Sequence, residues 1–90
     1  MDLTSLAANT VIIARTRNTV YTIQVDAGGR IRMMGSPDHC PDWTAIDSLG
    51  TVLLTGAIRD RWLEPGMRME FRVGARRVFT SRLAEVEVRR

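Results

Sequence analysis

Apolar and polar residues alternate with a period of two in several short segments of this 90-residue chain. The clearest segment is 67–73, in which methionine, phenylalanine and valine at odd positions alternate with arginine and glutamate at even positions. This alternation predicts a β-strand with one face in a core and the other facing water or a partner. The segment 20–26 repeats the pattern, with Tyr21, Ile23 and Val25 on its apolar side.

Glycines mark the turns that follow these two segments. The pair at 28–29 separates the segment 20–26 from an expected strand at 30–34, and 74–76 separates the segment 67–73 from one at 77–80. Glycine adopts the positive φ that tight turns require, so two β-hairpins are expected.

Further strands are expected at both ends of the chain. A strand at 10–16 turns at Asn18, a residue that tolerates the left-handed region, and completes a three-stranded meander. Pro65 and Gly66 fit the centre of a type II turn that leads into the strand at 67–73. The segment 84–88 alternates again and is expected to close the sheet.

The middle of the chain follows a different pattern. Residues 36–42 include two prolines and several turn formers, which indicates a loop. Apolar residues then recur three positions apart, at Trp43, Ile46 and Leu49, which allows a short helix at 43–49, a single turn, or no helical element.

These elements predict one all-β, mainly antiparallel domain that spans residues 1–90. The segment 51–58 is expected to form a further strand, with apolar residues on both faces, so Leu53 is expected to be covered by a subunit or by the helix. About six or seven short strands suggest a small barrel or a strongly bent sheet. The apolar fraction of 44% and charged fraction of 26% are those of a globular domain.

The cellular location is inferred from the targeting and membrane-spanning segments that the sequence does not show. Its longest apolar run, at 11–14, is far shorter than a membrane-spanning helix, so no membrane partner is expected. The N-terminal segment has an early acid and does not resemble a secretory signal. Cys40 is the single cysteine, which rules out an intrachain disulfide. A cytoplasmic protein is the simplest interpretation.

All thirteen basic side chains are arginines, and the net charge is +3. Arginine recognises phosphate and carboxylate through its planar fork. A genome rich in G and C also favours arginine codons over lysine codons. Because acidic residues are interleaved with the arginines, we favour codon usage as the explanation of the arginine excess.

Eight arginines are candidates for a basic face on the outside of the sheet or at its turns: Arg15, Arg17, Arg30, Arg32, Arg68, Arg72, Arg76 and Arg77. Small barrels bind single-stranded nucleic acid by combining such a face with exposed aromatic rings. Trp43, Trp62 and Phe79 are the available platforms. The preferred alternative is that outer arginines pair across strands with Glu70, Glu85, Glu87 and Asp26.

Four apolar residues are candidates for a protein interface: Met34, Trp43, Leu53 and Trp62. Tryptophan and arginine are enriched in interfaces, and a small domain often covers surplus apolar surface by pairing with itself. The primary hypothesis is therefore a non-enzymatic interaction or assembly module, self-associating as a dimer. Nucleic-acid binding through the basic face is the alternative.

No group of residues predicts catalysis or a cofactor. His39 and Cys40 lie beside Asp38 and Asp42, but a zinc site draws on separated pairs of ligands and no second histidine or cysteine exists. Neighbouring side chains in an extended loop point apart, which disfavours a Cys-His nucleophile. A surface loop with an incidental thiol is expected.

Two segments carry a family resemblance. The stretch 15–21 contains Thr-Arg-Asn-Thr-Val-Tyr, and 66–71 contains Gly-Met-Arg-Met-Glu-Phe. In these the chain resembles a family of small bacterial β-barrel-like proteins of uncharacterised function. The resemblance implies no activity, and the family's glycine-rich middle is replaced here by residues 36–49.

Overall fold

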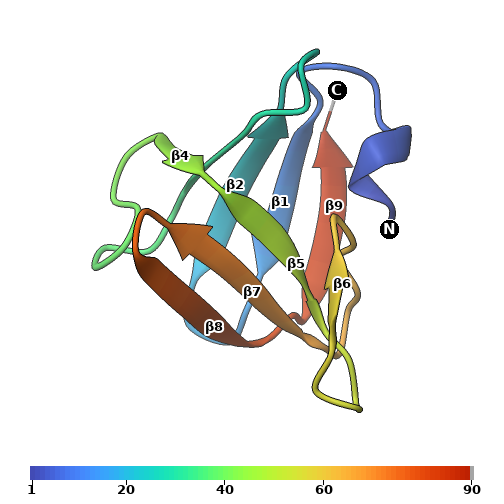
Figure 1. Ribbon diagram of the computed structural model, residues 1–90, viewed down its shortest axis with the longest axis vertical. Coiled ribbons are helices and arrows are strands. Elements are labelled where there is room, and N and C mark those ends of the chain that lie inside the picture. The colour runs from blue at the N-terminus through green and yellow to red at the C-terminus, as the bar shows by residue number, and fades with distance from the viewer. Residues whose placement is uncertain (90) are drawn as a thin grey trace.

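The computed structural model describes residues 1–89, which fold into β-strands and one 3₁₀ turn (Figure 1). The elements are η1 (Leu3–Ser5), β1 (Val11–Arg15), β2 (Val20–Val25), β3 (Ile31–Met34), β4 (Thr44–Ile46), β5 (Ser48–Val52), β6 (Ile58–Asp60), β7 (Arg68–Val73), β8 (Arg76–Arg82) and β9 (Glu85–Arg89). The all-β, antiparallel architecture expected from the alternating pattern is confirmed.

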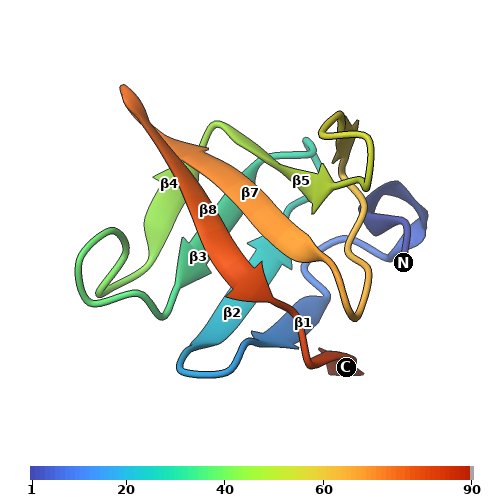
Figure 2. The same cartoon turned by 90° about the horizontal axis from the view of Figure 1, so that it is seen from below.

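The strands form two antiparallel sheets that pack across one another (Figures 1 and 2). The five-stranded sheet has the order β4-β3-β2-β1-β9, and the four-stranded sheet has the order β6-β5-β7-β8. The chain crosses between them at Asp47 and again at residues 83–84. Of the two architectures considered, the strongly bent sheet fits, because the sheets do not join into a closed barrel within residues 1–89.

The expected hairpins are all present. β1 pairs with β2, β2 with β3, and β7 with β8, each antiparallel. At Pro65-Gly66 the Met67 amide donates to the Glu64 carbonyl oxygen over 3.2 Å, and Gly66 has a φ of +87°. These are the hydrogen bond and the positive third-residue φ of a type II turn, as the sequence predicted.

The short helix that the spacing allowed at 43–49 does not form. The chain forms β4, a corner at Asp47, and β5 instead. Asp47 makes the corner by donating its amide to the Arg72 carbonyl oxygen and accepting the Gly74 amide on its carboxylate, both over 2.9 Å. The corner changes which residues face inward, so Ile46 and Leu49 both reach the core from different strands. Their spacing of three thus has a cause other than a helix.

The single strand expected at 51–58 is also wrong. A turn at residues 53–56 divides this segment into the end of β5 and β6. With β4, this division raises the number of strands in the described residues to nine, above the six or seven expected. Leu53 therefore lies in a turn, and no helix covers it.

The core lies between the two sheets. Ile12, Ile23 and Met33 from the five-stranded sheet face Met69 and Phe71 from the four-stranded one, and all five are fully buried. The rings of Tyr21 and Phe71 meet edge to face with centroids 5.8 Å apart. Leu3, Leu63, Leu83 and Cys40 complete the core from outside the strands. The inward faces predicted for the segments 20–26 and 67–73 are thus confirmed except at Met67, which does not belong to the core.

Among the described residues, no helix has the length and apolar character needed to cross a membrane.

Candidate functional site

The candidate arginines lie on two different surfaces. Arg15 and Arg32 lie on the outer face of the five-stranded sheet, and Arg30 precedes β3. The outer face of the four-stranded sheet carries Arg68, Arg72 and Arg77. Arg17 is exposed at the β1–β2 turn and Arg76 is exposed as the first residue of β8; neither forms an ion pair within residues 1–89. The single basic face expected from the sequence is therefore divided.

The larger basic surface is the outer face of β7 and β8. We call it the basic face and define it by Arg68, Glu70, Arg72, Arg77, Phe79 and Arg82. Cross-strand register places Arg72 opposite Arg77, Glu70 opposite Phe79, and Arg68 opposite Arg82. Phe79 is 43% exposed, and the Arg68 and Arg77 guanidinium carbons lie 5.7 and 4.9 Å from its ring centroid.

Glu70 lies beneath these arginines and is only 3% exposed. Its Oε1 atom is 3.5 Å from Arg72 Nε and 3.6 Å from Arg77 Nε. That oxygen accepts no hydrogen bond within residues 1–89. The sequence pattern correctly placed Glu70 on the outer face. The prediction that its side chain is exposed to water is wrong, because neighbouring side chains cover it.

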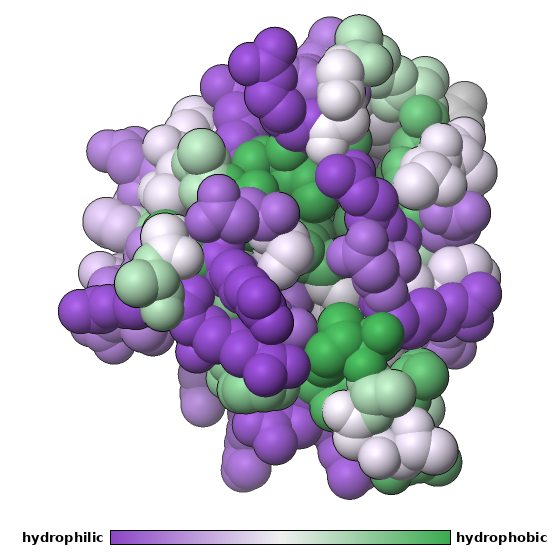
Figure 3. All heavy atoms as spheres, viewed as in Figure 1, coloured by the Kyte–Doolittle hydropathy of each residue, from purple (hydrophilic) through white to green (hydrophobic). Residues whose placement is uncertain are grey.

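Beside the basic face lies an apolar groove of about 330 Å³. It is lined by Val52, Leu53, Leu54, Gly66 and Met67, with Arg68 and Arg82 at its rim. Leu54 is 89% exposed at the tip of the β5–β6 turn. Figure 3 shows apolar surface at this lower end of the molecule, next to strongly hydrophilic side chains.

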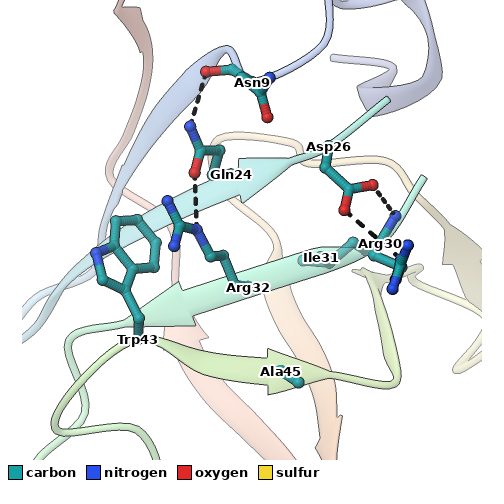
Figure 4. Close-up of a pocket in the computed structure, with 8 residues that line it drawn as sticks. All are labelled: Asn9, Gln24, Asp26, Arg30, Ile31, Arg32, Trp43 and Ala45. Carbon is teal, nitrogen blue, oxygen red and sulfur yellow. Dashed lines mark hydrogen bonds and ion pairs between the residues drawn. The ribbon is translucent and has the colours of Figure 1, made fainter. Parts of the chain in front are cut away.

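A second hollow, the Trp43 pocket, lies on the outer face of the five-stranded sheet and has a volume of about 390 Å³ (Figure 4). Arg32 Nε donates to Gln24 Oε1 over 2.7 Å, and Gln24 Nε2 donates to the Asn9 carbonyl oxygen over 3.0 Å. The Arg32 guanidinium carbon lies 4.4 Å from the centroid of the Trp43 ring. Asp26, Arg30, Ile31 and Ala45 line the rest of the pocket.

The four candidate interface residues do not form one patch. Met34 and Trp43 lie on the outer side of β3 and β4, while Leu53 is in the β5–β6 turn. Trp62 follows β6, where its Nε1 donates to Glu64 over 2.6 Å and the Arg59 guanidinium carbon is 3.5 Å from its ring centroid. The four residues therefore do not form a single dimer interface.

The predicted cross-strand pairing of arginines is present in part, in two of the five ion pairs of residues 1–89. Arg15 pairs with Glu85 across β1 and β9, and Glu70 pairs with Arg77 across β7 and β8. Asp26 pairs with Arg30 within the β2–β3 hairpin. Glu87 pairs with Arg89 on its own strand.

The His39-Cys40 segment differs from the expected surface loop. Cys40 is fully buried, and its backbone amide donates to the Ser36 carbonyl oxygen over 2.8 Å. The His39 ring meets Phe71 edge to face with centroids 6.5 Å apart. Across residues 1–89, no three His, Cys, Asp or Glu side chains are grouped as metal ligands. Cys40 is thus part of the core, and its thiol is not the surface thiol that the sequence predicted.

Several residues of these surfaces were not predicted. Arg82 faces Arg68 because a bulge between Arg68 and Glu70 shifts the register of β8. Gln24 and Ala45 belong to the Trp43 pocket through sheet pairing alone. Leu54 could have been recognised from the sequence, because it extends the apolar run that begins at Val52.

Comparison of the chain with protein-family models, curated proteins and solved structures finds no match. The family resemblance of the segments 15–21 and 66–71 stays a prediction, and the functional argument rests on the geometry of the molecule itself.

Proposed function

We propose that this domain is a non-enzymatic interaction module that binds an acidic, partly apolar segment of a partner protein on the basic face and the adjoining groove. One observation carries the proposal: an 89% exposed Leu54 marks the end of an apolar groove whose rim is formed by Arg68 and Arg82. Exposed apolar surface with a polar rim is characteristic of protein interaction sites.

The charge of the basic face favours an acidic partner. Its four arginines, Arg68, Arg72, Arg77 and Arg82, face a single carboxylate, that of Glu70, so its formal charge is +3 (four minus one). Glu70 is buried and does not present its carboxylate to an approaching molecule. A positive surface of this kind raises the association rate of acidic partners and repels basic ones.

The groove contributes the apolar part of the recognition. Covering an exposed leucine removes about 1.5–3 kcal/mol of unfavourable hydration, part of which is lost to ordering the partner. Val52, Leu53 and Met67 form the adjoining surface of the groove. A partner segment that combines carboxylates with a few apolar side chains satisfies both halves of the site.

A second copy of the chain fits this patch poorly. A two-fold dimer brings the same surface of both subunits together, so arginines at the rim face arginines. Self-association elsewhere on the molecule stays a prediction. Single-stranded nucleic acid, the other alternative, suits the arginines and Phe79 but leaves Leu54 without a role.

Fluorescence anisotropy with a labelled short peptide of alternating glutamate and leucine tests the proposal. The variants are Leu54→Ser, which removes exposed apolar surface, and Arg82→Gln, which removes a rim charge. Arg17→Gln is the matched control, because it removes an exposed arginine from a turn outside the site. A peptide with lysine in place of glutamate and an oligonucleotide serve as competing probes.

The proposal predicts binding of the acidic peptide that Leu54→Ser weakens about 5- to 30-fold and Arg17→Gln leaves unchanged. Binding of the oligonucleotide alone, insensitive to Leu54→Ser, would replace it with nucleic-acid recognition. Equal binding of the lysine peptide, or full affinity in both site variants, would refute it.

A further inference from the structure

The Trp43 pocket owes its shape to a small residue on an otherwise crowded sheet face. Register places Ala45 of β4, Arg32 of β3 and Gln24 of β2 in one row on the outer face of the five-stranded sheet. The methyl group of Ala45 leaves the surface low beside the taller side chains of Arg32 and Trp43 (Figure 4). The resulting hollow of about 390 Å³ lies in the size range of small-molecule sites.

Arg32 is held in place before any ligand arrives. Gln24 accepts from its Nε, and the Gln24 amide is in turn fixed by the Asn9 backbone. The ring of Trp43 covers one plane of the guanidinium. The terminal nitrogens Nη1 and Nη2 donate no hydrogen bond within residues 1–89, so the fork remains available for a bidentate anion.

A second arginine faces the same hollow. Arg30 lies two residues before Arg32 and also lines the hollow, but its guanidinium group lies beside Asp26, away from that of Arg32 (Figure 4). The one acid of the pocket, Asp26, is engaged: it accepts the amides of Gly28 and Arg30 and lies 3.6 Å from Arg30 Nε. Two arginines and one carboxylate give the pocket a formal charge of +1.

The Arg32–Trp43 stack also offers a flat surface. The Arg32 guanidinium carbon lies 4.4 Å from the centroid of the Trp43 ring, and Trp43 remains 38% exposed. Nucleic-acid bases stack on aromatic rings and on guanidinium planes without requiring a particular sequence. The site thus combines an oriented anion-binding fork with a stacking platform.

We propose that the Trp43 pocket binds a nucleoside monophosphate unit, with its phosphate on the Arg32 guanidinium group and its base stacked on the exposed part of the Trp43 ring. This unit is either a free mononucleotide or one residue of a single strand. The pocket is on the opposite sheet from the groove of the interaction module and does not depend on it.

The indole N–H signals of the two tryptophans provide a direct assay by nuclear magnetic resonance, assigned with Trp62→Phe. The probes are adenosine 5′-monophosphate, adenosine, inorganic phosphate and a short oligodeoxythymidine. Arg32→Gln removes the fork, and Arg17→Gln is the matched control on an exposed turn. Circular dichroism of each variant verifies that the sheets remain folded.

The proposal predicts that adenosine 5′-monophosphate shifts the Trp43 indole signal, and that Arg32→Gln weakens this binding about tenfold or more while Arg17→Gln has no effect. Adenosine and phosphate alone should each bind at least about tenfold more weakly, since each uses half of the site. Equal affinity for phosphate alone, an unmoved Trp43 signal, or full binding by Arg32→Gln would overturn it.

The oligonucleotide distinguishes the two sources of the ligand. For a strand, we expect tighter binding than for the mononucleotide, with a dependence of log affinity on log salt of about −0.7 for each phosphate contacted. For a free nucleotide, we expect the oligonucleotide to bind no more tightly than the monophosphate. Both results support the shared chemistry of phosphate and base.

Discussion

Replacement of Glu70 by glutamine tests how the basic face is held together. The Glu70 side chain is 4% exposed, and its Oε1 lies 3.5 and 3.6 Å from two arginine Nε atoms. Glutamine keeps the shape of the side chain but loses the negative charge. The substitution leaves Arg72 and Arg77 facing each other across β7 and β8 without an anion between them.

The expected cost lies between two known limits. Breaking a buried ion pair costs about 3–5 kcal/mol, whereas exposed pairs contribute about 0.2–1 kcal/mol. Arg72 and Arg77 are 51% and 46% exposed, so water partly solvates their charges once the carboxylate is gone. We therefore expect Glu70→Gln to lower the free energy of unfolding by about 2 kcal/mol, which is roughly 10 °C in Tm for a domain of this size.

Urea denaturation of Glu70→Gln measures this change, and the chain contains its own control. Glu85 pairs with Arg15 at 3.6 Å, but both side chains are well exposed, so Glu85→Gln should cost under about 0.5 kcal/mol. A double-mutant cycle with Arg77→Gln isolates the coupling across the two strands. Equal effects of the two glutamate substitutions, or no coupling between Glu70 and Arg77, would show that burial does not set the strength of this ion pair.

Three further predictions follow from the fold. Gly35→Ala should destabilise the domain by about 2 kcal/mol or more, because a Cβ there would lie 2.3 Å from the Val20 carbonyl oxygen; Gly56→Ala, with open space around it, should cost clearly less in the same urea assay. Burial raises the pKa of Tyr21 above its usual 10.0. The stability that the neutral side chain contributes is therefore complete below pH 10 and is lost as pH rises through the folded-state pKa. Absorbance titration of this single tyrosine measures the pKa, and a midpoint at or below 10.0 would contradict the prediction. Self-association predicts a dimer by size-exclusion chromatography with light scattering, and a monomer at high micromolar concentration would reject it.

Part of the candidate site was visible in the residue pattern. Strand alternation placed Arg68, Glu70 and Arg72 on one outer face, and the structure confirms that placement. Alternation does not report what neighbouring strands carry, so it missed the burial of Glu70 under Arg77 of β8. Solvent exposure on a sheet depends on cross-strand neighbours, which are distant in the chain.

The Trp43 pocket shows the same limit more strongly. Its polar members come from the loop before β1, from β2 and from β3, and its floor is Ala45 of β4. Arg30, Arg32 and Trp43 were candidates by residue type, but no local spacing links them to Asn9, Gln24 or Ala45. The row of Gln24, Arg32 and Ala45 forms because two consecutive antiparallel pairings, β2 with β3 and β3 with β4, align these residues.

The sequence by itself determined the all-β class, the hairpins expected at 20–34 and 67–80, and most inward residues of the most regular strands. Those features depend on a local period of two and on turn residues, which act within a few positions. Tertiary structure decided the rest: the corner at Asp47 in place of a helix, the division of arginines between two sheets, and the burial of Cys40. Each of these follows from hydrogen bonds and packing between residues far apart in the chain, where local spacing carries no information.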